Sequence, residues 1–222
     1  MSKMPVRRPK TVLKAPIDLE ALVRTAAFQL LFTRAEGIAP ELLAEVTGIS
    51  PHKLAALVDR LDDAGRVRRD GAGIVVGSAG LSVTPDRHQI EVEGREFWTW
   101  CAYDILGIFG ALGASGHAHS PSSPDRKPIE VRFIRGRPQR SDAVLFRPDA
   151  ELMDGCENVY EQWCPNSNLF ASRQLAEAWA AEHGPSGKVL SLNEAADLAT
   201  EEWKSVTDGL VVKREQTDAE RN

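Results

Sequence analysis

Three cysteines and one aspartate are the residues of this chain best suited to chemistry. Cys101 and Asp104 lie close together in an apolar segment, and Asp104 is the only carboxylate between Glu96 and His117. A carboxyl group in apolar surroundings must be hydrogen-bonded, paired or protonated, so we expect its pKa to be raised. A thiol beside such a carboxyl is a proton-transfer couple. The structural alternative is a core cysteine beside an aspartate that bonds to the backbone.

Cys164 is the second candidate thiol. It lies between Trp163 and Pro165 in a segment with little helix or strand character, and such a segment can direct a side chain into a cleft. Cys156 precedes it by a few residues in a polar turn. Two or three thiols with one carboxylate and no well-spaced histidine suit a soft metal that favours sulfur over oxygen. A closed zinc site is not expected, because Cys-x-x-Cys and His-x-x-x-His spacings are absent from the sequence.

Other features of the sequence give little support for a metal site or for other enzyme classes. His117 and His119 alternate, and alternate residues of a strand share a face. They fall within residues 113–128, which are rich in Gly, Ser and Pro and predict a loop, so we interpret them as solvated loop residues rather than as a ligand pair. The motifs Gly-x-Ser-x-Gly, Gly-x-x-x-x-Gly-Lys and Gly-x-Gly-x-x-Gly are also missing, which disfavours hydrolase, NTPase and dinucleotide-binding functions.

The first half of the chain predicts a helical module followed by a hairpin. Apolar residues recur there at three- and four-residue spacing, Ser50 and Pro51 are typical of a helix start, and glycines at 71 and 73 suit a tight turn. The predicted elements are helices at 17–31, 40–46 and 51–64 and strands at 66–70 and 74–76. This order outlines a winged-helix-like module over residues 17–80, preceded by a flexible basic arm at 1–16.

A winged-helix outline usually suggests DNA binding. The predicted third helix, however, carries Lys53 and Arg60 against Asp59, Asp62 and Asp63, which is a poor match to a phosphate surface. We therefore interpret the module as a helical cap packed on the second half of the chain.

The second half mixes strands and helices without a regular βαβ repeat, which favours the α+β class. We expect an α+β catalytic domain with a small sheet over residues 81–212, followed by a polar tail at 213–222. The predicted strands are 81–84, 89–92, 129–135, 143–146 and 189–192, and the predicted helices are 95–112, 173–183 and 193–206.

Composition places the chain among ordinary globular proteins. Of its 222 residues 42% are hydrophobic, and 27 lysines and arginines face 32 aspartates and glutamates, for a net charge of −5. This acidic balance weakens the case for nucleic-acid binding. No apolar run is long enough to cross a membrane, and no secretory signal precedes the odd number of cysteines, so we expect a cytoplasmic protein with free thiols.

Two separated segments resemble one known family. Residues 93–104 end in Trp-Cys-Ala-Tyr-Asp and resemble the Trp-Cys-Ala-x-Asp segment of the organomercurial (alkylmercury) lyases. Trp163 and Cys164, followed by Leu-Phe-Ala-Ser at 169–172, resemble that family's second cysteine segment. The predicted elements follow the family's order over roughly residues 17–206, and two motifs in the right order are far more specific than either alone.

The resemblance implies a cytosolic enzyme that cleaves carbon–mercury bonds by protonolysis to a hydrocarbon and Hg(II). Cys101 and Cys164 match its two mercury-binding thiols, and Asp104 matches its proton carrier. No cofactor is implied; external small thiols are expected for turnover, and a mercuric reductase is a candidate partner that receives Hg(II). The family often has a further cysteine in the loop after the first motif and another directly after the second one. This chain has the cysteine-free residues 120–124 and Pro165 there, and Cys156 matches neither position.

Two functions of other classes stay open at this point. One is a winged-helix regulator whose thiols sense a soft metal or an oxidant; Arg66, Arg68 and Arg69 near the hairpin favour it, and the acidic third helix opposes it. The other is a protein that holds copper or zinc without turnover, which would take up metal and release no hydrocarbon.

Overall fold

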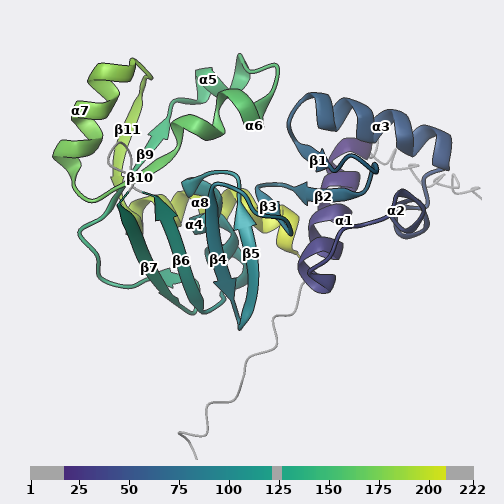
Figure 1. Ribbon diagram of the computed structural model, residues 1–222, viewed down its shortest axis with the longest axis horizontal. Coiled ribbons are helices and arrows are strands. Elements are labelled where there is room, and N and C mark those ends of the chain that lie inside the picture. Colours follow the sequence, from purple (N-terminus) through teal and green to yellow (C-terminus); the bar gives the residue numbers. More distant parts are fainter. Residues whose placement is uncertain (1–17, 122–126, 209–222) are drawn as a thin grey trace, which may run out of the picture.

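The computed structural model describes residues 18–121 and 127–208 and has the mixed α+β architecture that the sequence predicts (Figure 1). An antiparallel sheet of eight strands, in the order β1-β2-β3-β5-β4-β6-β7-β8, forms the body of the molecule. A second sheet has three strands in the order β10-β9-β11. The predicted arm at 1–16 and tail at 213–222 lie outside the described residues.

The N-terminal part contains three helices and a hairpin, as predicted. Asp18 caps the first helix by accepting hydrogen bonds from the backbone N–H groups of Glu20 and Ala21, and a proline begins each of the next two helices. Apolar side chains of the three helices face one another in the core. The elements are α1 (Leu19–Arg34), α2 (Pro40–Thr47), α3 (Pro51–Asp63), β1 (Val67–Arg69) and β2 (Val75–Ser78).

The hairpin joins the main sheet, which is therefore larger than the small sheet expected. Strand β3 (Leu81–Ser82) pairs with β2 on one side and with β5 (Arg95–Thr99) on the other. The strands of the N-terminal part and those of the second half therefore belong to one continuous sheet. The remaining strands of this sheet are β4 (His88–Val92), β6 (Gly116–Pro121), β7 (Pro128–Ile134) and β8 (Arg137–Pro138).

The predicted helix at 95–112 is wrong in its first third. Residues 95–99 form β5, and only α4 (Ala102–Leu112) is helical. Glu93 and Gly94 both have positive φ, at 47° and 75°, and this turn folds β5 back onto β4. Phe97 and Thr99 then point into the core from alternate positions of a strand. The aromatic run before Cys101 fits a buried helix and a half-buried strand equally well, and the turn decides between them.

The predicted loop at 113–128 is also corrected. Gly113 ends α4 with φ 60°, and β6 then pairs with both β4 and β7. His117 and His119 thus lie on one strand and share its more exposed face, while Ala118 and Ser120 are buried on the other. Residues 122–126 lie outside the described part of the chain. Pairing with two neighbouring strands overrides the weak strand propensity of this Gly- and Ser-rich segment.

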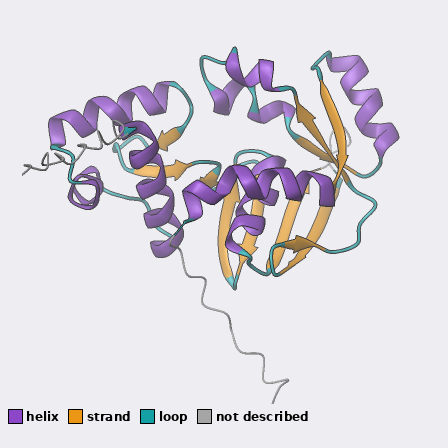
Figure 2. Ribbon diagram, turned by 180° about the vertical axis from the view of Figure 1, so that it is seen from behind, coloured by secondary structure: helices purple, strands orange, loops and turns teal. Residues whose placement is uncertain are grey.

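Helix α8 (Leu192–Thr207) crosses the main sheet beside α4 (Figure 2). Two glycines of α4 allow this close approach, because a Cβ at Gly107 would lie 2.5 Å from the indole of Trp203 and one at Gly110 would lie 2.0 Å from Thr200 Oγ1. The packing of α8 brings the indole of Trp203 to the first turns of α4, where its Nε1–H donates to the carbonyl of Ala79 at 3.1 Å.

The second sheet supports the segment that carries Cys164. Strand β9 (Val144–Pro148) is its centre, with β10 (Asn168–Phe170) and β11 (Gly187–Ser191) as edges and α7 (Arg173–His183) packed on it. Between β9 and β10 the chain forms the short helices α5 (Ala150–Asp154), α6 (Val159–Gln162) and the 3₁₀ turn η1 (Cys164–Asn166). None of these three was predicted, because each is too short to show a helical period. Among the described residues, no helix combines the length and the apolar character needed to cross a membrane.

A buried histidine makes the stability of this fold depend on pH. His88 lies on the buried face of β4 with its Nδ1 2.7 Å from Ser120 Oγ, and burial, with a smaller contribution from Arg87, lowers its pKa from 6.5 to about 3. Below pH 6.5 the unfolded chain therefore binds a proton that the folded chain excludes. We expect the free energy of unfolding to fall by up to about 1.4 kcal/mol per pH unit from this residue between pH 6 and 4.

Urea unfolding of His88→Gln at pH 7 and pH 4.5 checks this expectation, since the variant should lose that part of the pH dependence. His52→Gln, at an exposed position of α3, is the matched control and should keep it. An unchanged pH dependence in His88→Gln would contradict the expectation.

Candidate functional site

The structure brings Cys101, Asp104 and Cys164 together. Their ligand atoms, the two Sγ atoms and one carboxylate oxygen, all lie within 4.8 Å of one another, and all three residues are buried. Cys156 is not part of this group; its partly buried thiol donates to the carbonyl of Leu152 at 2.9 Å. His117 and His119 are also absent from it. Two thiols and a carboxyl group can thus reach a single soft metal ion at this place.

Cys101 and Asp104 meet through the start of α4. Cys101 is the extended residue before the helix, with φ −145°, and its backbone N–H donates to Asp104 Oδ2 at 2.8 Å. Asp104 in the first turn thereby caps the helix N-terminus. The helix predicted at 95–112 would include both residues; the two do adjoin, but through this cap, because the helix begins one residue after Cys101. The Thr99 hydroxyl donates to the Cys101 carbonyl at 3.0 Å and fixes the turn from β5.

The Cys164 segment is tied directly to the same helix end. The backbone N–H of Ala102 donates to the carbonyl of Ser167 at 3.1 Å, and Ser167 in turn donates to the carbonyl of Cys164 at 3.1 Å. A second connection runs through Arg87, whose guanidinium donates to the carbonyls of Trp100 at 2.9 Å and Tyr160 at 3.2 Å. These bonds hold the residues before Cys101 and those before Cys164 at a fixed separation.

Gly80 lies against the Asp104 carboxyl group. Its φ is +86°, and a Cβ built there would lie 2.3 Å from Asp104 Cγ. Its carbonyl accepts from the backbone N–H of Trp100 at 3.1 Å, so the turn between β2 and β3 is attached to the strand that leads to Cys101. Sequence analysis missed Gly80, because nothing in the local pattern of residues 78–81 connects that turn to Asp104.

Burial governs the protonation of the site. It raises the pKa of Asp104 from 3.8 to about 7, although the hydrogen bonds with Cys101 oppose the shift. This rise is the one that the sequence predicts. Burial also raises the pKa of the Cys101 thiol well above 9, and the hydrogen bond with Cys164 and the charge of Asp104 act in the same direction. Cys101 is thus a thiol at neutral pH, and Asp104 can gain or lose a proton there.

A cavity of about 280 Å³ opens beside this group, with Asp104 and Cys164 in its wall. Much of the wall is aromatic: Trp100, Tyr103, Trp163 and Trp203. Among the described residues, the Nε1 atoms of Trp100 and Trp163 and the Tyr103 hydroxyl are buried without a hydrogen-bond partner. Burial raises the pKa of Tyr103, so its hydroxyl stays neutral. The aromatic part of the wall therefore suits the apolar part of a small molecule next to Cys164 and Asp104.

Comparisons with known proteins identify the family of this chain. The sequence pattern of the alkylmercury lyase family matches residues 81–203. An alkylmercury lyase of Bacillus cereus is 28% identical over 168 residues, covering 73% of this chain and 72% of the relative. One from Pseudomonas putida is 28% identical over 173 residues, covering 76% of each.

The fold has a solved counterpart. A crystal structure described as the mercury-bound form of MerB2 matches with a TM-score of 0.74 and 24% identity, covering 84% of this chain and 91% of that one. At this identity the likeness concerns the fold alone, while the family pattern spans more than half of the chain and includes both cysteine segments. The chain belongs to the alkylmercury lyase family of enzymes.

Proposed function

We propose that this chain cleaves carbon–mercury bonds by protonolysis and releases a hydrocarbon and Hg(II). The observation that carries the proposal is the buried group of two thiols and one titratable carboxyl, within 4.8 Å of one another, beside a cavity with a partly aromatic wall that includes Asp104 and Cys164. Mercury is soft and binds sulfur strongly, which gives the two thiols their role. The carbon atom needs a proton when its bond to mercury breaks, which gives the carboxyl its role.

The first step of the proposed reaction is ligand exchange. An organomercurial bound to a small thiol, R–Hg–SR′, enters the cavity and exchanges SR′ for one of the protein thiols, Cys101 or Cys164. The protein thiol forms an S–Hg bond, and its proton leaves with the displaced ligand as R′SH. Since burial disfavours a free Cys101 thiolate, bond formation to mercury is what makes loss of that proton favourable.

The second step delivers the proton to carbon. The other thiol passes its proton to the Asp104 carboxylate and binds mercury, which now carries two sulfurs and the organic group. Added electron density from sulfur weakens the carbon–mercury bond. Asp104 then protonates the carbon as this bond breaks, giving R–H, Hg(II) bound by Cys101 and Cys164, and the carboxylate again. One thiol proton thus ends on R′SH and the other on the hydrocarbon.

The last step releases Hg(II) from the two protein thiols. External small thiols exchange with Cys101 and Cys164, restore both protein thiols and remove Hg(II); a mercuric reductase is the proposed recipient. The cycle needs reduced thiols, which the cytoplasm maintains, so we place the protein there. Residues 81–212 form the proposed catalytic domain.

The test is incubation of the purified protein with phenylmercury and an excess of small thiol, followed by gas chromatography of the headspace and assay of Hg(II). We expect benzene and Hg(II) in equal amounts, over many turnovers. Mercury uptake without benzene would instead identify a protein that only holds metal.

The contact between Gly80 and Asp104 gives a prediction about positioning. In Gly80→Ala the added methyl group must displace the Asp104 carboxyl, since its place lies 2.3 Å from Asp104 Cγ. We expect benzene release to fall roughly 10²-fold, the loss typical of a misplaced catalytic group. Rates of benzene release with saturating phenylmercury check this.

Gly48→Ala is the matched control, because Gly48 has φ +68° and open space around the built Cβ. It carries the same backbone strain without the clash and should keep most of the activity. Equal losses of activity in the two variants would show that backbone strain, and not the position of Asp104, accounts for the effect.

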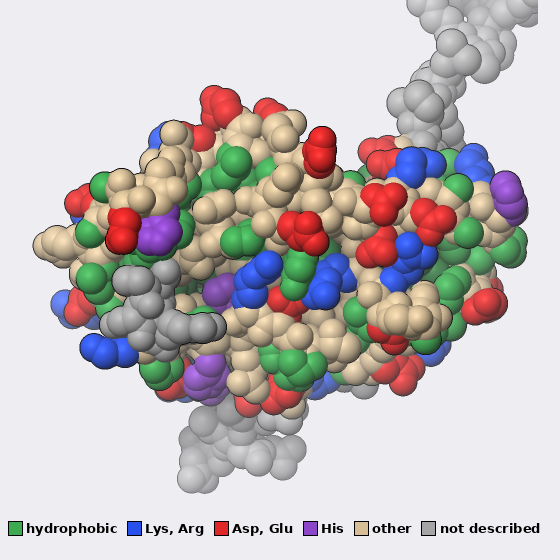
Figure 3. Space-filling model, turned by 45° about the horizontal axis from the view of Figure 1, so that its top comes forward, with side chains coloured by type: hydrophobic (Ala, Val, Ile, Leu, Met, Phe, Trp, Pro, Cys, Tyr) green, Lys and Arg blue, Asp and Glu red, His purple; other side chains and the backbone are tan. Residues whose placement is uncertain are grey.

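The N-terminal module bears on the alternative of a DNA-binding sensor. We propose a winged-helix-like arrangement for residues 17–80 that does not read DNA. Arg69 of β1 forms ion pairs with Asp59 at 2.8 Å and Asp62 at 3.0 Å on α3, and Arg68 pairs with Asp86 at 2.5 Å. The basic residues next to the hairpin are thus partly neutralised. On the face drawn in Figure 3, acidic and basic side chains are interspersed.

We therefore predict no duplex binding tighter than the non-specific range of about 10⁻⁴ to 10⁻⁶ M at physiological salt. Fluorescence polarisation with labelled duplexes, measured across a range of salt concentrations, checks this. Sequence-specific binding in the nanomolar range would support the sensor function instead.

A further inference from the structure

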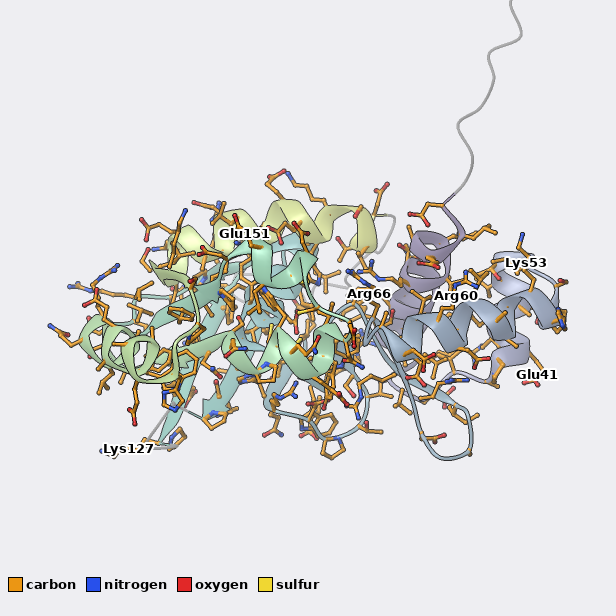
Figure 4. All side chains as sticks on the ribbon, turned by 90° about the horizontal axis from the view of Figure 1, so that it is seen from above. Glu41, Lys53, Arg60, Arg66, Lys127 and Glu151 are labelled. Atoms are coloured by element: carbon orange, nitrogen blue, oxygen red, sulfur yellow. The ribbon has the colours of Figure 1, made fainter. Side chains whose placement is uncertain are left out.

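Two arginines from the N-terminal module line the cavity that holds Asp104 and Cys164. Arg24 comes from α1, and Arg66 lies between α3 and β1. Figure 4 shows Arg66 where the N-terminal helices meet the rest of the molecule. The proposed protonolysis assigns no task to either of them.

Neither guanidinium has a partner within the described residues. Arg24 Nε is buried without a hydrogen bond, and the side chains of Arg24 and Arg66 form no ion pair there. Nearby arginines differ in this respect: Arg60 pairs with Glu20 at 3.1 Å, and Arg69 pairs with two aspartates. Burial, and then the charge of Arg66, lower the pKa of Arg24. The charges of Asp18 and Glu20, at the start of the same helix, act in the opposite direction.

The other charged groups of the cavity wall do not neutralise this pair. Glu202 is engaged by Arg147 at 3.1 Å, and Asp154 is exposed and forms no ion pair with Arg24 or Arg66. The Asp104 carboxyl accepts from the Cys101 N–H at 2.8 Å, and within the described residues it forms no ion pair with Arg24 or Arg66. Two partly buried cations that line one cavity without an acidic partner raise the free energy of the protein unless an anion joins them. A guanidinium pair is well shaped for a carboxylate, because its planar N–H groups match both oxygens.

We propose that Arg24 and Arg66 bind a carboxylate carried by the mercurial complex, either on its small-thiol ligand or on its organic group. This inference rests on the proposed function for the identity of the complex. Because Cys164 and Asp104 line the same cavity as the two arginines, a carboxylate held by Arg24 and Arg66 would keep the mercury complex in that cavity. The pair thereby acts as a specificity determinant and takes no part in breaking the carbon–mercury bond.

The test combines two organic groups with two thiols. Phenylmercury and 4-carboxyphenylmercury are each supplied with 2-mercaptoethanol or with mercaptoacetate, and KM and kcat are measured for the parent, Arg24→Gln and Arg66→Gln. We expect the parent to show a KM roughly 10- to 100-fold lower for carboxylate-bearing complexes, as for a charged hydrogen-bonded pair, and both variants to lose this preference with little change in kcat. A lower KM with mercaptoacetate would show that the thiol ligand carries the carboxylate, and a lower KM with 4-carboxyphenylmercury would show that the organic group does.

Arg34→Gln is the matched control. Arg34 belongs to the same helix as Arg24 but is exposed and pairs with Glu36, so this variant should retain the parent's preference. Equal KM values for all four combinations in the parent would overturn the proposal. A uniform loss across all four in Arg24→Gln and Arg66→Gln would overturn it as well, because it would show a structural role.

A binding measurement separates this inference from the proposed function. Quenching of the cavity tryptophans reports binding of the mercuric complexes of mercaptoacetate and of 2-mercaptoethanol, and neither complex contains a carbon–mercury bond. Tighter binding of the mercaptoacetate complex, lost in both arginine variants, would support the carboxylate site even if the protein released no hydrocarbon. Equal affinities for the two complexes, together with equal KM values, would remove it.

Discussion

Replacing Asp104 by asparagine should separate mercury binding from carbon–mercury cleavage. The asparagine side chain has nearly the same size and can still accept the hydrogen bond from the Cys101 N–H, so the start of α4 and the two thiols should keep their places. An amide, however, cannot carry the proton to carbon. We expect benzene release to fall about 10²- to 10⁴-fold, the usual effect of removing a general acid, while thiol-dependent mercury binding largely survives.

Mercury affinity by equilibrium dialysis and benzene release by gas chromatography, measured on the same preparation, check this prediction. Asp63→Asn, at an exposed residue of α3, is the control and should match the parent in both. If Asp104→Asn cleaved within a few-fold of the parent, the proton would have to come from a thiol or from water. If binding and cleavage fell in parallel, Asp104 would be a structural residue.

The two buried thiols should each be required for cleavage. Serine in place of Cys101 or Cys164 replaces a soft sulfur with a hard oxygen, which binds mercury far more weakly. We expect Cys101→Ser and Cys164→Ser to lower benzene release by on the order of 10³-fold or more, as the loss of an essential nucleophile does. The measurement is the initial rate of benzene release, with circular dichroism spectra to show that each variant is folded.

Cys156→Ser is the matched control for these substitutions. Its thiol lies outside the group of three ligand atoms and is hydrogen-bonded to Leu152, so the variant should retain most of the activity. Loss of activity in Cys156→Ser together with retention in Cys164→Ser would assign the second mercury-binding thiol to Cys156.

Sequence periodicity predicted those elements whose local signals agree with their packing. The helices at Pro51–Asp63 and Arg173–His183 begin at clear starts and end next to glycine or a short turn, and the structure has them as predicted. The strand β5 was missed, because its aromatic residues fit two periods and the deciding turn at Glu93 and Gly94 is short. Strand β6 was missed because its pairing with β4 and β7 comes from residues far away in the sequence.

For the candidate site too, local sequence predicts some features and only tertiary contacts supply the others. The types and local spacing of Cys101 and Asp104 indicate a thiol–carboxyl couple, and the setting of Cys164 singles it out as a second thiol. Its meeting with the other two depends on the hydrogen bond between Ala102 and Ser167, which no local pattern reveals. Gly80, Arg24 and Arg66 come to the cavity from the N-terminal half, so only the tertiary structure connects them with the thiols.

Cleavage of phenylmercury in D₂O tests the central claim most directly. The Asp104 carboxyl and both thiols exchange their protons with solvent, so a protonolysis that passes through them must place one deuterium on the released benzene. We predict that mass spectrometry will show monodeuterated benzene in an amount equal to the Hg(II) released. Benzene without deuterium would contradict the account, because its hydrogen would then have come from a C–H bond and not from the site.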